Sequence, residues 1–317
     1  MKQRILITGG LGYVGGRLAV DLSTDPNYEV IVTTRSIAPP QTSWLPQGKV
    51  MSLDLLNRQD CDRICEGIDT VIHLAALNEI DSGKDPDKAL LVTGLGSLNL
   101  LKAAEQAKVK QFIYFSTAHI YRAPLVGNIT ENDVPRPAHP YSITHKTAED
   151  FILAEGDRSS LRTLVLRLSN GIGAPTHPDV NRWTLVGNDL CRQAVTEKAL
   201  TLRSSGLQWR DFITLRDVGE AVKHLLQPEI DWGNGIFNLG GEMPLRIIDI
   251  AQLIQQRCEI TLGFTPKLIR PAPKPEEKYQ NLHYSIDKLK HTGFILHGNL
   301  TEEIDATLHL CQKKWDQ

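Results

Sequence analysis

Residues 4–18 read RILITGGLGYVGGRL, an apolar strand pattern that leads directly into a glycine-rich turn and a helical stretch. Gly9, Gly12 and Gly15 follow the strand and open the helix. Glycines at these places allow a tight turn and a close backbone approach, and a helix N-terminus offers N–H groups to a pyrophosphate. The stretch therefore predicts a dinucleotide-binding βαβ unit; the alternative is a merely structural turn.

Outward from this stretch, short β-branched runs alternate with helical stretches through the first half of the chain. Strands are expected at RILIT (4–8), EVIVTT (29–34), KVMSLD (49–54), TVIHLAA (70–76), KQFIYFST (110–117) and RTLVLRLSN (162–170). Helices are expected over 12–22, 58–65 and 87–106. This alternation predicts an α/β fold, a Rossmann-type doubly wound parallel sheet that binds ligands at the carboxyl ends of its strands.

The pattern changes after Asn170, where a loop rich in Gly, Pro and His (GIGAPTHPDVNRW) begins. Mixed helices and short strands follow to the end of the chain. We expect residues 1–170 to form the dinucleotide-binding domain, with 211–242 returning to it. Residues 171–210 and 243–317 are expected to form a smaller, discontinuous α/β cap that binds the substrate.

Composition excludes several classes of function. The 317 residues are 41% hydrophobic and 23% charged, with a formal net charge of −2. Without a long basic run or an apolar span, neither nucleic-acid nor membrane binding is expected. The five cysteines form no CxxC pair, so we expect reduced thiols and no metal site. The first strand begins at Arg4, leaving no room for a signal peptide, and a cytoplasmic location is expected.

The end of the second strand bears on the choice of cofactor. NAD-binding units usually place an acid there to bind the adenosine ribose. This chain has Thr34 and Arg35 instead. Because an arginine pairs with a 2′-phosphate that a carboxylate would repel, NADP(H) is favoured, with NAD(H) as the alternative. Asp54, which ends the third strand, is a candidate partner for the adenine amino group.

The ordered motifs resemble those of the extended short-chain dehydrogenase/reductase family, which contains nucleotide-sugar epimerases, dehydratases and reductases. The resemblance covers nearly the whole chain. It rests on TGGLGYVG (8–15), HLAA (73–76), STAHIY (116–121), RLSN (167–170), QWRDF (208–212) and FNLGG (237–241). It implies a homodimer joined through a helix bundle and a nucleotide-sugar substrate.

Site residues follow from the resemblance position by position. Thr117 would hydrogen-bond the reacting sugar oxygen, and Tyr141 would be the acid/base. His145 is expected to act beside it as a catalytic residue. Two further residues, His119 and Glu79, are candidate catalytic participants in the same pocket; the alternative for each is a polar wall or loop residue. The expected substrate-binding residues are Asn78, Glu79, Asn170, Arg210 and Arg270; an ion pair of Arg210 with Asp211 or Asp217 is the alternative for that arginine. The expected cofactor-binding residues are Gly9, Leu11, Gly12, Tyr13, Val14, Gly15, Arg35, Asp54, Leu55, Leu74, Ala75, Ala76, Tyr141 and His145.

The chain departs from the family pattern at four places. His145 occupies the position of the family's lysine, Thr93 that of an asparagine, and Thr34 that of the ribose-binding acid. The fourth departure is TAH (117–119), which lacks the Asp-Glu pair that follows the threonine in sugar 4,6-dehydratases. That pair supplies the acid and base for water loss, so dehydration of that kind is not expected.

The segment YSITHKTAED, which begins at Tyr141, is expected to open a helix after the Pro-rich RPAHP. On a helix His145 lies about 40° round from Tyr141 and Lys146 about 140° round, so only the histidine shares the tyrosine's face. A free tyrosine titrates near ~10, and making it a base near neutral pH requires lowering its pKa by roughly 3 units, or ~4 kcal/mol.

A histidine is mostly neutral at cytosolic pH and should stabilise the phenolate less than a lysine does. Reduction needs only the neutral phenol of Tyr141, whereas oxidation needs the phenolate. The substitution therefore favours ketoreduction, with C4 as the expected position, within the wider class of oxidoreductases and epimerases. Two alternatives stay open: a cofactor-binding protein with weak or no catalysis because His145 replaces the lysine, and a reductase of a non-sugar carbonyl compound.

Overall fold

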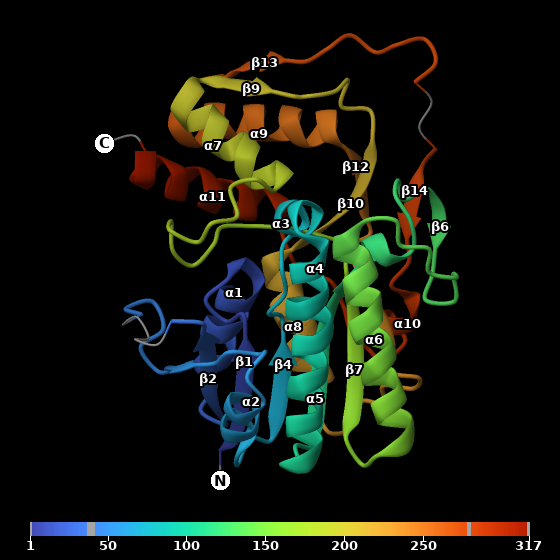
Figure 1. The fold of residues 1–317 in the computed structure, drawn as a ribbon. Helices are drawn as coiled ribbons and strands as arrows, with labels where there is room; N and C mark the ends of the chain where they lie inside the picture. Colours follow the sequence, from blue (N-terminus) through green and yellow to red (C-terminus); the bar gives the residue numbers. More distant parts are fainter. Residues whose placement is uncertain (1, 37–41, 278–279, 316–317) are drawn as a thin grey trace. The chain divides into compact units, whose positions relative to one another are not determined.

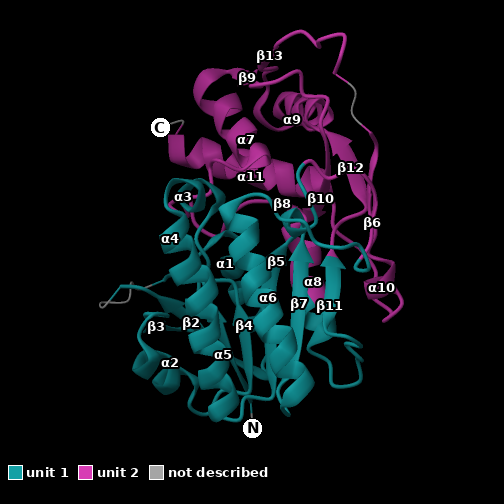
Figure 2. Cartoon of the chain, turned by 45° about the vertical axis from the view of Figure 1, so that its right-hand side comes forward, with its two compact units in different colours: residues 1–123, 131–168, 222–238 teal, residues 124–130, 169–221, 239–317 magenta. Residues whose placement is uncertain are grey.

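The computed structural model describes residues 2–36, 42–277 and 280–315. Contacts divide the chain into two compact units, coloured separately in Figure 2. The first unit contains 1–123, 131–168 and 222–238, and the second contains 124–130, 169–221 and 239–317. Four segments that the sequence assigned to the dinucleotide-binding domain thus fall in the second unit: 124–130, 169–170, 211–221 and 239–242.

The first unit is built on a seven-stranded sheet of order β11-β7-β5-β4-β1-β2-β3, in which the strands from β7 to β3 pair in parallel. Its strands are β1 (Gln3–Thr8), β2 (Tyr28–Thr34), β3 (Lys49–Ser52), β4 (Thr70–His73), β5 (Gln111–Thr117), β7 (Arg162–Leu168) and β11 (Ile236–Leu239). The strand order reverses beside β1, which places the start of the chain at the topological switch point of a doubly wound sheet. The expected Rossmann-type fold is confirmed.

Successive side chains along the buried strands point to opposite faces of the sheet, and apolar side chains form a core on each face. Leu6, Ile31, Val71 and Val165 point to one face, where they join a single apolar cluster. The helices α2 (Arg58–Cys65), α5 (Gly96–Gln106) and α6 (Pro140–Arg158) contribute the other half of that cluster and lie side by side over the sheet (Figure 1). The helix α1 (Tyr13–Ser23) packs on β1 and β2.

The predicted helix over 87–106 is interrupted in the structure. It consists of α4 (Pro86–Ala89), a π-helical segment η1 (Leu90–Leu95) and α5, preceded by the short α3 (Glu79–Lys84). Thr93 lies within η1, and its carbonyl accepts a hydrogen bond from the Ser97 hydroxyl. A side chain that bonds to the carbonyl four residues back competes with the regular backbone ladder. The periodicity of apolar residues continues across the π-segment, so the sequence alone did not reveal it.

The second unit packs three helices around its own apolar core: α7 (Val186–Glu197), α9 (Ile247–Leu262) and α11 (Leu300–Trp315). Its sheets are small. They are β8 (Asn170–Ile172) with β10 (Trp209–Thr214) and β12 (Met243–Arg246), β9 (Ala199–Thr201) with β13 (Lys267–Ile269), and β6 (Gly127–Ile129) with β14 (Leu282–Tyr284). The second unit also contains α10 (Asp287–Lys290). The helix α8 (Leu215–Leu225) begins in the second unit and ends in the first, and the 3₁₀ turn η2 (Ala118–Ile120) belongs to the first.

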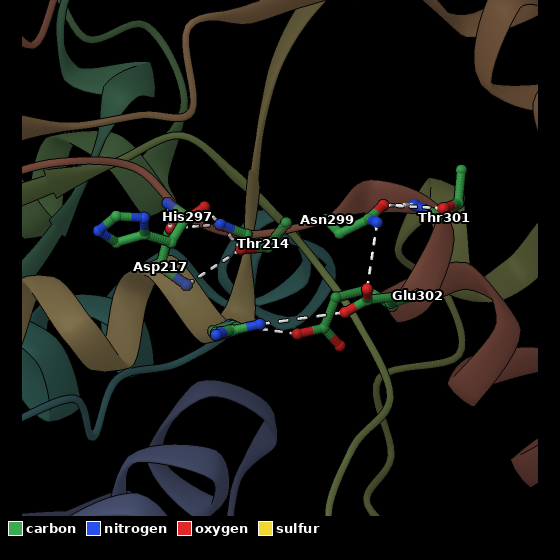
Figure 3. A network of polar contacts seen from close by, with 9 residues as sticks. Thr214, Asp217, His297, Asn299, Thr301 and Glu302 are labelled. Atoms are coloured by element: carbon green, nitrogen blue, oxygen red, sulfur yellow. Dashed lines mark hydrogen bonds and ion pairs between the residues drawn. The ribbon is translucent and has the colours of Figure 1, made fainter.

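One buried carboxylate fixes the approach to α11. Asp217 Oδ1 accepts the backbone N–H groups of His297 and Gly298, each at 2.8 Å, and Asp217 Oδ2 accepts the hydroxyl of Thr214 at 2.8 Å. Figure 3 shows these contacts beside those at the start of α11. Since Asp217 is only 1% exposed, its oxygens depend on these donors for their hydrogen bonds.

All five cysteines are free and buried. None of the helices in the described ranges is long and apolar enough to cross a bilayer. Within the same residues no group of three or more His, Cys, Asp or Glu side chains is arranged to hold a metal ion.

Candidate active site

The glycine loop has the geometry of a phosphate cradle. Gly9 adopts φ +71°, and the N–H of Gly12 bonds to its carbonyl at 2.9 Å. A Cβ added at Gly15 would lie 2.3 Å from the Gly9 carbonyl oxygen, so only glycine fits there. Gly12 is the N-cap of α1, and the first turn carries no acidic side chain. The N–H groups and dipole of α1 therefore suit a pyrophosphate, and the residues present fit a dinucleotide.

The segment after β4, which contains the predicted cofactor-binding residues Leu74, Ala75 and Ala76, lies against this loop. A Cβ on Gly9 would meet Ala75 N and the Leu74 carbonyl carbon, each at 3.0 Å. The backbone N–H of Ala75 also donates to the Thr8 hydroxyl at 3.3 Å. Leu74, Ala75 and Ala76 are all half-buried, which leaves them accessible to a ligand.

Three predicted adenosine contacts differ in their surroundings. Arg35 is exposed and lies immediately after β2, where the adenosine ribose would be expected. Asp54 is exposed as well, and its carboxylate accepts the N–H of Leu56 at 3.0 Å. Leu55 is 8% exposed and packs in the core beneath α5. Its side chain therefore has a packing role, and its carbonyl accepts a hydrogen bond from the Asn99 side chain at 2.9 Å.

Tyr141 and His145 share one face of α6, as their spacing predicted. Their ring centroids are 4.5 Å apart in an edge-to-face arrangement. The helix begins at Pro140, and the His139 side chain caps it by accepting the N–H of Tyr141 at 3.2 Å. Lys146 pairs instead with Asp150 one turn further along the helix. The lysine next to the expected position therefore does not replace the family's lysine.

His145 is 3% exposed and lies among buried polar groups. Its Nδ1 lies 2.7 Å from the Tyr114 hydroxyl. The ring of Tyr114 packs beside that of His73, with the ring centroids 5.5 Å apart. His73 Nε2 lies 2.8 Å from Ser97 Oγ, and His73 Nδ1 lies 2.5 Å from the Thr8 hydroxyl. Tyr114 and His73 thus lie between the candidate proton-transfer site and the strand that precedes the glycine loop.

Burial controls the protonation of His73 and Tyr114. It lowers the pKa of His73 to about 3, with a smaller contribution from His145. Burial raises the pKa of Tyr114 well above its ordinary value, followed in importance by the charges of Glu149 and Tyr141. His73 is therefore a neutral imidazole and Tyr114 a neutral phenol at physiological pH.

Thr117 ends β5, and its hydroxyl oxygen accepts the N–H of His119 at 3.2 Å. Thr117 is buried, whereas the His119 side chain is half-buried. The hydroxyl caps the 3₁₀ turn that carries His119, so a substitution at Thr117 would also disturb the histidine. The structure thus couples two residues that the sequence proposed separately.

An ion pair lies one turn beyond His145. Glu149 is fully buried, and Arg167 binds it with two hydrogen bonds, Nε to Oε1 at 3.2 Å and Nη2 to Oε2 at 2.9 Å. Arg167 Nη1 also donates to the Tyr121 hydroxyl at 2.9 Å, and Tyr121 donates to Asn238 at 2.7 Å. Arg167 thus compensates the buried Glu149 carboxylate, which lies near the candidate catalytic residues on α6.

The predicted substrate-binding residues are divided between the units. In the first unit Asn78 caps α3, accepting the N–H of Asp81 at 2.9 Å, and Glu79 lies half-buried in the first turn of that helix. The side chain of Asn78 therefore has a structural role that the sequence did not indicate.

In the second unit Asn170 donates to the Asp211 carbonyl at 2.9 Å, and Arg210 to the Trp209 carbonyl and the Gln208 side chain, each at 3.2 Å. Arg270 is exposed, and Nη1 donates to the carbonyl of Ser205. The Asp211 carboxylate accepts the N–H groups of Gly241 and Met243, each at 3.0 Å.

Sequence reasoning missed Tyr114 and Ser97. A signal existed for Tyr114, because it is a tyrosine within a strand otherwise read as fully buried, and a buried phenol nearly always has a partner. No comparable signal marked Ser97, whose position depends on the π-segment before it.

The sheet order and the glycine loop together define a dinucleotide-binding protein of the Rossmann class. Comparison with known proteins agrees. A family model described as "NAD dependent epimerase/dehydratase family" matches residues 5–240. The chain belongs to this family, and the resemblance seen in the sequence is confirmed.

Similar proteins include a putative UDP-glucose 4-epimerase from Methanocaldococcus jannaschii, 23% identical over 308 residues that cover 96% of this chain and 97% of that protein. Among solved structures, the Thermus thermophilus UDP-glucose 4-epimerase in complex with NAD is 25% identical, with a TM-score of 0.81, covering 98% of this chain and 99% of that one. RMD from Pseudomonas aeruginosa complexed with NADPH is 23% identical, with a TM-score of 0.79, covering 99% and 100% of the two chains.

The protein is therefore an NAD(P)-dependent enzyme of the nucleotide-sugar epimerase/dehydratase family. The prediction from the sequence that this chain is an enzyme is confirmed.

Proposed function

We propose that the protein transfers hydride to or from a nucleotide-activated sugar, with the keto carbon at C4 and ketoreduction as the favoured direction. The observation that carries the proposal is the pairing of Tyr141 with His145 on one face of α6, their ring centroids 4.5 Å apart. A tyrosine beside an imidazole, which can accept or donate a proton, is suited to moving a proton.

Each residue has a distinct task in this proposal. Tyr141 donates a proton to the sugar oxygen or removes one from it, while Thr117 orients that oxygen and His119 lines the same pocket. When bound, the nicotinamide supplies or accepts the hydride. The diphosphate of the substrate is proposed to contact Asn170, Arg210 and Arg270, with Asn78 and Glu79 near the sugar. Gly9, Leu11, Gly12, Tyr13, Val14, Gly15, Asp54, Leu55, Leu74, Ala75 and Ala76 are proposed to bind the cofactor.

NADP(H) is the proposed cofactor, with NAD(H) as the alternative. Arg35 is exposed directly after β2, where its guanidinium has room to pair with a 2′-phosphate. Replacing Arg35 with Asp should reverse the preference. The ratio of Kd values for NADPH and NADH, measured by titration calorimetry, decides between the two cofactors.

The assay mixes the purified protein with each cofactor and a panel of UDP-, GDP-, dTDP- and CDP-sugars, following nicotinamide absorbance and sugar products together. Tyr141→Phe is the test variant. Tyr284→Phe is the control, because Tyr284 is a buried tyrosine that lies on β14 in the second unit and has no part in the proposed reaction. Turnover that disappears in Tyr141→Phe and persists in Tyr284→Phe supports the proposal.

The dependence of kcat on pH tests the histidine. The proposal predicts an ionisation of histidine type in the wild-type profile, shifted in His145→Lys. A profile indifferent to that substitution argues against coupling between His145 and Tyr141. Tight cofactor binding without conversion of any sugar favours a cofactor-binding protein with weak or no catalysis. Turnover restricted to non-sugar carbonyl compounds favours a reductase of such compounds.

A homodimer is also proposed, on the support of an apolar surface on two neighbouring helical elements. Leu91 and Leu95 on η1 are 47% and 39% exposed, and Ile143 and Phe151 on α6 are 45% and 41% exposed. Exposed apolar side chains grouped in this way are typical of interfaces. Sedimentation of Phe151→Glu beside the wild type tests this: a dimer that becomes a monomer supports it, and a wild-type monomer contradicts it.

A further inference from the structure

A long loop of the second unit follows directly after β8, the strand that begins at Asn170. Residues 173–185, all of which the structure describes, join β8 to α7 without forming a helix or a strand. The strand β8 pairs with β10, which carries Arg210, so the loop begins beside two residues proposed to bind the substrate. Ordered loops of this length are uncommon inside compact domains and are usually functional. The loop is therefore a candidate for contact with the nucleotide-sugar.

The conformation of this loop depends on side chains. Its backbone bonds close short turns, such as Val180 N–H to the His177 carbonyl at 3.1 Å and Arg182 N–H to the Val180 carbonyl at 2.9 Å. Bonds of so short a span do not fix the path of the whole loop. The Trp183 indole makes a longer connection, because its Nε1 donates to the Pro178 carbonyl at 3.1 Å.

The last turn of α11 binds the same carbonyl. Lys314 Nζ donates to the Pro178 carbonyl at 2.5 Å and lies 3.1 Å from Asp179 Oδ1. A carbonyl oxygen has two lone pairs, so the ammonium and the indole N–H together satisfy it. The Trp315 ring packs edge-to-face on the Trp183 ring, with the centroids 4.7 Å apart. Two consecutive residues at the end of α11 therefore hold the loop at two points.

The first turn of α11 meets the start of the loop. Gly173 has φ +151°, and a Cβ added there would lie 2.3 Å from Glu303 Oε2. The other oxygen of this carboxylate, Oε1, accepts the N–H of Arg216 at 3.1 Å, and Glu303 is 6% exposed. The helix α11 also packs against α7, into which the loop leads (Figure 1). It thus supports the loop near its start and again from Pro178 to Trp183.

We propose that Lys314 and Trp315 are positioning residues that hold the loop 173–185 in the conformation that contacts the nucleotide-sugar. A loop that is ordered in advance binds more tightly than a mobile one, because its conformational entropy is lost before the ligand arrives. Neither residue has a part in the proposed proton transfer or in the glycine loop. Their loss should therefore weaken substrate binding and leave kcat and cofactor binding unchanged. This inference rests on the proposed function for the identity of the ligand.

Hydrogen exchange of the protein without ligand tests whether α11 holds the loop. Lys314→Met removes the ammonium but keeps a long side chain, and Trp315→Leu removes the ring. Each variant should accelerate exchange of the amides within 176–183 roughly tenfold and leave the sheet of the first unit unchanged. Lys314→Arg keeps a donor for the Pro178 carbonyl and should exchange as the wild type does. Lys313→Met is the matched control, because Lys313 is the neighbouring, exposed lysine.

Titration calorimetry with UDP, GDP, dTDP and CDP, in the presence of the cofactor, measures the effect on binding. For the diphosphate that binds the wild type, Kd should rise roughly tenfold in Lys314→Met, since one or two loop residues must be ordered again. The KM of the corresponding nucleotide-sugar should rise by a similar factor at unchanged kcat, which is the pattern expected when binding alone is weakened.

Faster exchange confined to the loop, together with weaker binding of the diphosphate, supports the proposal. Exchange in both variants equal to that of the wild type overturns it, and so does unchanged affinity for the diphosphate despite faster exchange. Faster exchange throughout the second unit also overturns it, because the two residues would then stabilise the whole unit. If none of the four diphosphates binds the wild type, the proposed function fails, whereas the exchange result still decides whether α11 holds the loop.

Discussion

Removing Arg167 while leaving Glu149 in place should be among the most destabilising single changes in the first unit. The two side chains are 3% and 0% exposed and joined by two hydrogen bonds. In Arg167→Leu the Glu149 carboxylate remains buried without its partner, beside His145 and Tyr141 on α6. Breaking a buried pair on one side costs about 3–5 kcal/mol, and the loss of the donor to Tyr121 adds about 1 kcal/mol.

The double variant Glu149→Leu/Arg167→Leu should recover most of this loss, because apolar side chains of similar size often replace a buried ion pair at little cost. The free energy of unfolding is measured by urea denaturation for the wild type, both single variants and the double variant. Arg158→Leu is the matched control, since Arg158 pairs with Glu155 on the same helix but is exposed, and its loss should change little.

The loss in free energy of unfolding caused by Arg167→Leu should also be smaller at acid pH, because protonation of Glu149 removes the uncompensated charge. A double variant as unstable as Arg167→Leu would refute the reasoning, because it would show that packing rather than the stranded charge sets the cost. A single variant within about 1 kcal/mol of the wild type would refute it as well.

Three further predictions concern other parts of the chain. Gly15→Ala should abolish cofactor binding and lower the melting temperature of the free protein, because the added methyl would overlap the Gly9 carbonyl and displace the loop backbone. Cofactor titration and thermal denaturation check this. Burial raises the pKa of Asp211 to about 6, above the value of ~4 expected in the unfolded chain. The folded protein therefore holds this proton more tightly than the unfolded chain does. The resulting stabilisation is fully present below pH ~4 and is lost as the pH rises through 6. The free energy of unfolding should fall by about 3 kcal/mol over that window, and denaturation of Asp211→Asn should show a flat profile. Asp217→Ala should cost about 2–6 kcal/mol by orphaning the N–H groups of His297 and Gly298, and hydrogen exchange at those two amides should accelerate.

The sequence predicted the first unit well because its signals are local. The apolar β-branched runs, the glycine loop and the spacing of Tyr141 and His145 each follow from periods of a few residues. The helix α2 has the bounds that its sequence predicted, 58–65, since Asn57 caps it and accepts two backbone N–H groups.

The remainder depends on contacts between distant segments. Tyr114 and His145 are 31 residues apart, and nothing in either segment indicates their hydrogen bond. The small sheets of the second unit pair strands of three residues, such as β6 with β14, that lie far apart along the chain. Strands this short carry too few residues for a period to be recognised.

The alternation of the two units along the chain has a consequence for synthesis. The edge strand β11 is made only after 169–221, which belong to the second unit, although it joins the sheet through contacts such as Val165 N–H with the Gly235 carbonyl at 2.7 Å. On the ribosome β7 therefore keeps an open edge while the whole of that interval is translated. An open parallel edge is a template for pairing with other nascent chains. Slow translation of 169–221 should therefore increase the dependence of folding on chaperones. Synonymous codons that slow translation of this segment should increase aggregation of the protein.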